Sequence, residues 1–219
     1  DYRFIINYKD QWNNFTKGYK TFSASADVTL LRKKLKNDFI GCGLVLSRDE
    51  AGDSGFGTTW VNFSTSYHKA LDYLKKQYLT FGIQGGLIQQ GISNSDLIWD
   101  TQWNGNDYDP TLSSGNITMT NIKVFDLSTG ILWYYIPNSD ASIVSAIGIS
   151  HITSPYHSFY EIKSLRLYRK LSIYLGGEFA LNNSVSVLPI GIFIKQGPSQ
   201  EINVGAYVKY KISQGSESD

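Results

Sequence analysis

The sequence predicts an all-β protein and, more narrowly, a transmembrane antiparallel up-and-down β-barrel. Three observations favour this class. Apolar and polar residues alternate with a period of two over ten segments, as in strands with one apolar face and one polar face. The polar faces are mostly Gly, Ser, Asn and Gln, which suit a hydrated lumen better than a surface in bulk water. Aromatic residues make up 14% of the chain and gather near strand ends, where membrane barrels carry interfacial girdles.

Five strands are expected in the first part of the chain. The fifth, over residues 78–90, is long for a soluble protein, whose strands usually have about five or six residues. The alternating positions on the less polar parity are Phe4, Ile6, Tyr8; Phe22, Ala24, Ala26, Val28; Ile40, Cys42, Leu44, Leu46; Thr59, Val61, Phe63, Thr65, Tyr67; and Leu79, Phe81, Ile83, Leu87.

Five more strands are expected in the second part, the weakest of them over residues 143–149. Their apolar positions are Leu127, Thr129, Ile131, Trp133, Tyr135; Ile143, Ser145, Ile147, Ile149; Leu171, Ile173, Leu175, Phe179, Leu181; Leu188, Ile190, Ile192, Ile194; and Ile202, Val204, Ala206, Val208, Tyr210, Ile212. Connections alternate roughly between short ones, at 182–183 and 197–199, and long ones, at 94–118 and 151–166. Outer-membrane barrels have two rims of this kind.

Composition limits the alternatives. The 219 residues suit one domain, 1–219. Twenty Lys and Arg against nineteen Asp and Glu give no basic footprint for nucleic acid, and one Cys gives no disulfide framework. No run approaches the ~20 apolar residues of a membrane helix. A mean hydropathy of -0.22 fits both a membrane barrel and a soluble β-sandwich, so the sandwich stays open.

If the chain is a barrel, the odd and even positions of each strand face different surroundings, lipid on one side and water on the other. We predict that the apolar parity faces lipid, including Val61, Phe63, Leu79, Phe81, Ile83, Leu171, Ile173, Leu175, Val204 and Val208. We predict that the polar parity lines the lumen, including Asn62, Ser64, Gln84, Glu178, Asn203 and Lys209.

Several blocks together resemble a known family. They are "FIINYKDQW", "KTFSASADVTL", "IGCGLVLSRDEAGDSGFGTTWVNFSTSYHKAL", "YLTFGIQGGLIQ" with "DLIWDTQW", "FDLSTGILWYY" and "INVGAYVKYKI". In this order, from Phe4 to Ile212, they resemble the PorP/SprF family, outer-membrane proteins of the type IX secretion and gliding-motility machinery of Bacteroidetes. Family members usually have an Asn-Pro-Ala-Tyr-like segment before the first block and further strands after the last, both missing here.

The resemblance implies a location, a strand number and partners. It places the chain in the bacterial outer membrane and implies about fourteen strands, so we expect the domain to be incomplete at both ends. A wall of ten strands would leave two unpaired edges in lipid. The resemblance also implies an anchor that holds a periplasmic ring lipoprotein of the machine or the C-terminal domain of a secreted adhesin.

Catalytic and metal-binding patterns are weak, so we expect neither an enzyme nor a cofactor. His68, His151 and His157 lack the spacing of a zinc site and are expected to be strand-end or loop residues. The glycines around Cys42 do not complete a dinucleotide fingerprint. Clustered acids at 49–55 and 104–109 only vaguely suggest calcium, and glycine-rich turns explain them better.

Two other functions use the same strands. A passive channel would be lined by the polar parity, with Lys209, Lys211, Glu178, Asp126 and Gln84 tuning its selectivity. A soluble β-domain would bind glycan through surface Trp and Tyr. Dependence of solubility on detergent separates the soluble domain from both membrane readings.

Overall fold

The computed structural model describes residues 2–12, 18–32, 34–52, 55–92, 97–112, 121–159 and 165–211. Ten strands form in these ranges, as predicted, and the helical element among them is the short 3-10 turn η1 (Asp100–Gln102). No helix in the described ranges has the length and hydropathy to cross a membrane. The strands are β1 (Tyr2–Gln11), β2 (Tyr19–Leu30), β3 (Phe39–Ala51), β4 (Phe56–Ala70), β5 (Gln77–Gly91), β6 (Asn121–Asn138), β7 (Ala141–Ser150), β8 (Lys170–Ala180), β9 (Val185–Gln196) and β10 (Ser199–Tyr210).

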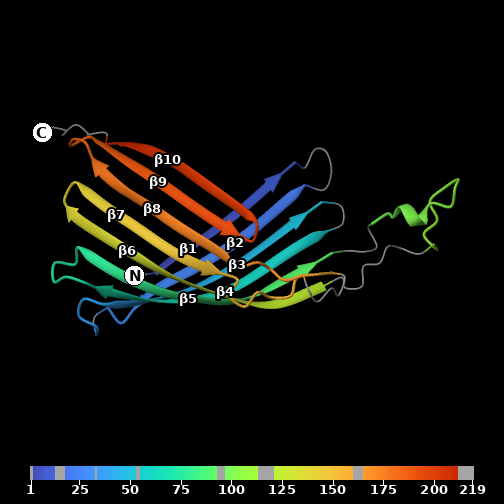
Figure 1. Cartoon of the computed structure of the whole chain (residues 1–219), viewed down its shortest axis with the longest axis horizontal. Helices are drawn as coiled ribbons and strands as arrows, with labels where there is room; N and C mark the ends of the chain where they lie inside the picture. Colours follow the sequence, from blue (N-terminus) through green and yellow to red (C-terminus); the bar gives the residue numbers. More distant parts are fainter. Residues whose placement is uncertain are drawn as a thin grey trace, which may run out of the picture.

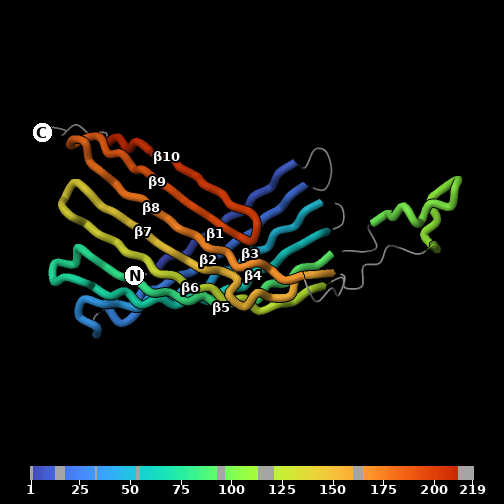
Figure 2. The backbone as a smooth tube through the Cα atoms, viewed as in Figure 1, coloured from blue at the N-terminus to red at the C-terminus, as the bar shows by residue number. Residues whose placement is uncertain are grey.

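The strands form one antiparallel up-and-down sheet in chain order, which confirms the predicted fold class. The sheet is strongly curved, and β6 to β10 pass in front of β1 to β4 (Figure 1). The backbone trace shows the same curvature (Figure 2). Within the described ranges β1 and β10 are the edges of the sheet, so the structure shows the wall of the predicted barrel and not its closure.

Short polar turns set the register of neighbouring strands. Between β8 and β9, the Asn182 side-chain oxygen accepts hydrogen bonds from the backbone N–H groups of Ser184 and Val185, both at 2.9 Å. Between β9 and β10, Gly197 has a φ of 56°, in the left-handed region that glycine adopts without cost. These turns explain why the strands pair with their neighbours along the chain.

Register assigns each residue to one of two faces, because directly opposed residues of an antiparallel pair lie on the same side of the sheet. Val61 is opposite Leu87, and Phe81 is opposite Ile131. We call their side the outer face. Ser64 is opposite Gln84 on the other side, which we call the inner face.

Burial along the strands is the reverse of that in a water-soluble protein. On β5, Phe81 of the outer face is 49% exposed, whereas neighbouring Thr80 of the inner face is 8% exposed. Among the described residues of the strands, the buried large apolar side chains are Ile88 and Ile122, both on the inner face. Large apolar side chains that cover one whole face and stay exposed need an apolar environment other than a protein core.

Strand β9 differs from the prediction. Leu188, Ile190, Ile192 and Ile194 were expected on the lipid-facing parity, but register places them on the inner face. Ile192 lies opposite Tyr174 of β8 and Asn203 of β10. Both parities of β9 are largely apolar, so its own sequence does not define its outer side, and pairing with its two neighbours decides.

The strand ends form two rims. The long-loop rim carries the connections 12–18, 52–55, 92–120, 151–169 and 197–198, and the short-loop rim carries 31–38, 71–76, 139–140 and 181–184. The short connections predicted at 182–183 and 197–199 therefore lie on opposite rims. Loop length separates the rims less strictly than the sequence suggested.

Candidate functional site

The inner face forms a hollow of about 440 Å³ that extends from β4 to β8. Leu132 lines it together with small or polar side chains of the inner face. They include Ser64, Ser66, Gln84, Ser128, Ser172 and Tyr174.

The six residues predicted to line the lumen all lie on the inner face. Asn62 is opposite Gly86, where an added Cβ would come within 2.5 Å of the Val61 carbonyl oxygen. Glu178 of β8 and Lys209 of β10 form an ion pair of 2.8 Å across β9. Register therefore brings together two charges that are 31 residues apart in the chain.

The ten residues predicted to face lipid all lie on the outer face. Register connects them from β4 across to β10, and Leu175 and Val204 both lie opposite Gly191 of β9. Exposure of these side chains is high, from 40% at Val61 to 83% at Val204, except that Leu171 is intermediate. Contact of this face with lipid itself stays a prediction.

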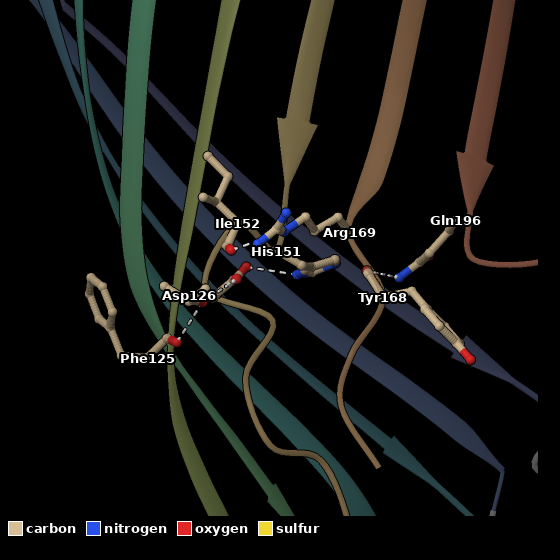
Figure 3. A network of polar contacts seen from close by, with 8 residues as sticks. Phe125, Asp126, His151, Ile152, Tyr168, Arg169 and Gln196 are labelled. Atoms are coloured by element: carbon tan, nitrogen blue, oxygen red, sulfur yellow. Dashed lines mark hydrogen bonds and ion pairs between the residues drawn. The ribbon is translucent and has the colours of Figure 1, made fainter. Parts of the chain in front are cut away.

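The β7–β8 connection is fastened to β6 (Figure 3). His151 Nδ1 lies 2.8 Å from Asp126 Oδ2, and the two side chains are 18% and 11% exposed. The Ile152 backbone N–H donates to the Leu127 carbonyl at 2.9 Å, and the Thr153 hydroxyl donates to the Phe125 carbonyl at 3.2 Å. His151 adopts a left-handed backbone (φ 59°), a strained conformation that these bonds offset.

From this attachment the loop crosses the inner face. The rings of Phe159 and Phe56 on β4 pack edge to face with centroids 6.3 Å apart, although β5 and β6 separate β4 from β7. Pro155 and Ser158 of the loop are buried. Ile122 of β6 is only 4% exposed at the same end of the sheet. The described part of the loop therefore lies over the inner face at the long-loop ends of β4 to β6, and we call this end of the inner face the covered mouth.

A polar cluster joins a turn to the end of β4 at the short-loop rim. Asp38 accepts hydrogen bonds from the Tyr67 hydroxyl, from the Ala70 backbone N–H at 3.0 Å and from Lys69 Nζ at 3.0 Å. These bonds, that from Tyr67 above all, lower the pKa of Asp38 from its ordinary 3.8 to about 2. The ionised carboxylate holds the 31–38 turn against the end of β4.

The histidines and acidic loops give no metal centre within the described ranges, where no group of three or more His, Cys, Asp or Glu could hold an ion. His68 stacks on Phe39 and lies within hydrogen-bond distance of Ser66 and Thr80. In the 104–109 turn, the Asn104 side-chain oxygen accepts hydrogen bonds from the backbone N–H groups of Asn106 and Asp107, so it stabilises the turn. Residues 53 and 54 of the other acidic loop lie outside the described residues.

Sequence reasoning missed the His151–Asp126 pair and the Asp38 cluster. Their members are 25 and about 30 residues apart, so neither forms a local motif. A signal did exist for the second, because Asp38 precedes β3 and Lys69 lies near the end of β4, and a hairpin brings those positions together.

Comparison with known proteins identifies the family of the chain. No curated protein sequence matches the chain. Among solved structures, the translocator domain of autotransporter NalP from Neisseria meningitidis is similar, with 10% identity and a TM-score of 0.35; the match covers 95% of this chain and 86% of that chain. The family model described as type IX secretion system membrane protein PorP/SprF matches residues 1–216. The chain therefore belongs to the PorP/SprF family of type IX secretion system membrane proteins.

Proposed function

We propose that the chain is an outer-membrane barrel component that anchors a subunit of the secretion machine, or a secreted adhesin, at the cell surface. The outer face supports the membrane placement. Every strand from β4 to β10 contributes apolar side chains to it, and burying them in hydrocarbon stabilises the sheet by about 25 cal/mol for each Å² removed from water.

The covered mouth is the observation that favours an anchor over a pore. The β7–β8 loop, held by His151 and Asp126, reaches Phe56 and lies over the inner face. Ile190 and Ile192 of β9, together with Tyr174, add bulk farther inside. A passage for solutes needs an open polar path, whereas an anchor tolerates a filled interior.

The two rims suit two kinds of partner. Outer-membrane barrels place short turns in the periplasm and long loops outside, which puts the 92–120 and 151–169 connections at the cell surface. Adhesin C-terminal domains would then meet the long-loop rim, and the periplasmic ring lipoprotein the short-loop rim. The 97–112 segment, drawn in green beyond the end of the sheet in Figure 1, presents exposed Ile98 and Trp103.

Affinity purification tests the anchor. We expect the tagged protein in mild detergent to retain a secretion-machine subunit or an adhesin end-domain. Replacement of residues 97–112 by a Gly-Ser linker should reduce recovery of one such partner while heat-modifiable gel mobility stays native. The same linker inserted at Ser139–Asp140, on the opposite rim, is the control for recovery of the adhesin end-domain, which is the partner expected at the long-loop rim. Equal recovery from both variants would count against docking by that segment.

The alternative is a passive channel, favoured by the hollow of about 440 Å³ and by the Lys209–Glu178 pair, which lies on the same inner face. A channel should give stable currents in planar bilayers. The Lys209→Glu variant should then shift selectivity toward cations, because two acids would face the lumen. Robust open-pore currents from a protein that retains no partner would refute the anchor.

A further inference from the structure

Two adjacent turns of the short-loop rim concentrate positive charge. Residues 31–38 and 69–77 contain seven Lys and Arg and two Asp, although the whole chain is nearly neutral. The opposite rim differs, since residues 92–120 contain four Asp and no Lys or Arg. Charge is therefore distributed unevenly along the strand direction.

These turns are ordered by their own hydrogen bonds. The Lys34 and Leu35 N–H groups donate to the Leu31 carbonyl at 2.9 and 3.0 Å. In the second turn Asp72 Oδ1 accepts from the N–H groups of Lys76 and Gln77, each at 2.9 Å. The Asp38 cluster joins the first turn to the end of β4, so the backbone that carries Lys34 and Lys36 is held next to that strand.

The acids of these turns are already engaged, whereas most of the lysines are not. Asp38 is paired with Lys69, and Asp72 caps backbone N–H groups. Among the described residues no acidic partner is found for the ammonium groups of Lys34, Lys36, Lys75 and Lys76, which are exposed. We call these four the rim lysines.

Apolar side chains accompany the rim lysines. Tyr73 is 96% exposed and Leu74 75%, and Leu31 and Leu71 are also exposed. A cavity of about 350 Å³ between the two turns is lined by Leu35, Lys36, Leu71 and Tyr73. This mixture of ammonium groups and apolar side chains is typical of a membrane interface, where lysine stems lie along apolar surface and their heads reach polar groups.

We propose that the rim lysines, with Leu71, Tyr73 and Leu74, bind the headgroups of anionic phospholipids. The inference rests on the membrane placement of the proposed function. The two turns directly continue the outer-face positions Tyr67 and Leu79, where the lipid-facing surface ends and headgroup phosphates begin. Their net positive charge selects anionic over zwitterionic headgroups.

Native mass spectrometry tests the proposal. The folded protein in detergent is mixed with equal amounts of phosphatidylglycerol and phosphatidylcholine of the same acyl chains. We expect phosphatidylglycerol adducts to exceed phosphatidylcholine adducts at least about fivefold, the gain that a single surface lysine can give. The excess should shrink in 0.5 M salt, because exposed charges are screened.

Variants assign the preference to the patch. Changing the four rim lysines to Gln should bring the adduct ratio close to one, and changing them to Arg should preserve it. The matched control removes four exposed lysines near the long-loop rim, Lys9→Gln, Lys20→Gln, Lys123→Gln and Lys195→Gln, and should leave the ratio unchanged. Heat-modifiable mobility verifies that each variant is folded.

Three results would overturn the proposal: no preference in the unaltered protein, a preference that survives in the rim-lysine variant, or an equal loss in the control. If the rim-lysine variant lost a co-purifying protein while keeping its lipid ratio, the patch would belong to that protein instead. Docking at the long-loop rim is measured separately by recovery of partners after changes at 97–112, so the two proposals fail independently.

Discussion

An arginine placed on either side of β10 tests which face meets lipid. Val204 and Asn203 are neighbours near the middle of the strand Ser199–Tyr210. They are consecutive residues of one strand and point to opposite faces of the sheet. Val204 lies opposite Gly191, and Asn203 lies opposite Ile192. Val204→Arg puts a guanidinium on the outer face, and Asn203→Arg puts the same group on the inner face.

Depth sets the size of the effect. The strand has 12 residues, close to the ~9–11 that span a bilayer, so its sixth residue lies near the midplane. An arginine facing lipid there costs about 2–4 kcal/mol, a ~30-fold to nearly 1,000-fold shift of the folding equilibrium. On the inner face the arginine has Glu201 two residues away on the same side, and we expect a cost below about 1 kcal/mol.

Urea titration of the protein in lipid vesicles, read by heat-modifiable gel mobility, measures both changes. The pair Ile173→Arg and Ser172→Arg repeats the comparison on β8, inside the sheet. Gly176 is unsuitable as an inner-face site, because an added Cβ would meet the Tyr174 hydroxyl at 2.6 Å. Equal destabilisation on both faces in both pairs would refute the assignment of lipid to the outer face.

Three further predictions follow from particular contacts. Asp126→Asn should weaken the attachment of the β7–β8 loop to β6 by about 1.5–3 kcal/mol. The expected observation is faster hydrogen exchange of the backbone amides next to His151, and unchanged exchange there would contradict a stabilising His151–Asp126 contact. The folded pKa of Asp38, about 2, lies below its ordinary 3.8, so its contribution to stability is present above pH 4 and is lost as pH falls from about 4 to about 2. The melting temperature of the protein should therefore drop over that window. A drop of the same size in the Asp38→Asn variant would exclude this carboxylate as the cause. Gly86→Ala should cost about 1–3 kcal/mol of unfolding free energy because its Cβ would meet a backbone carbonyl at 2.5 Å. Gly205→Ala, on the same face but with open space around it, should leave the unfolding free energy unchanged. Equal effects of the two substitutions would argue against the close packing between β4 and β5.

The sequence by itself determined the class, the strand number and most of the faces. Alternation is strict on β4, where Val61 and Phe63 point outward and Asn62 and Ser64 inward, so even a single strand shows its two sides. Physical chemistry explains this, because a strand that meets lipid on one side and water on the other must separate apolar from polar side chains at a period of two. The ordered blocks also carried the family resemblance, which the match over residues 1–216 confirmed.

Only the tertiary structure decided the features that depend on pairing between distant residues. On β9 both parities are rich in apolar residues, so the register with β8 and β10 determined that Ile190 and Ile192 lie inside. The covered mouth required His151 to meet Asp126 and Phe159 to reach Phe56, four residues that no local motif connects. The contact of Phe159 with Phe56 follows from the curvature of the sheet, which brings a loop over strands that are not its neighbours, whereas His151 meets Asp126 through the pairing of β6 with β7. A period-two pattern contains no information about curvature or about which strands pair.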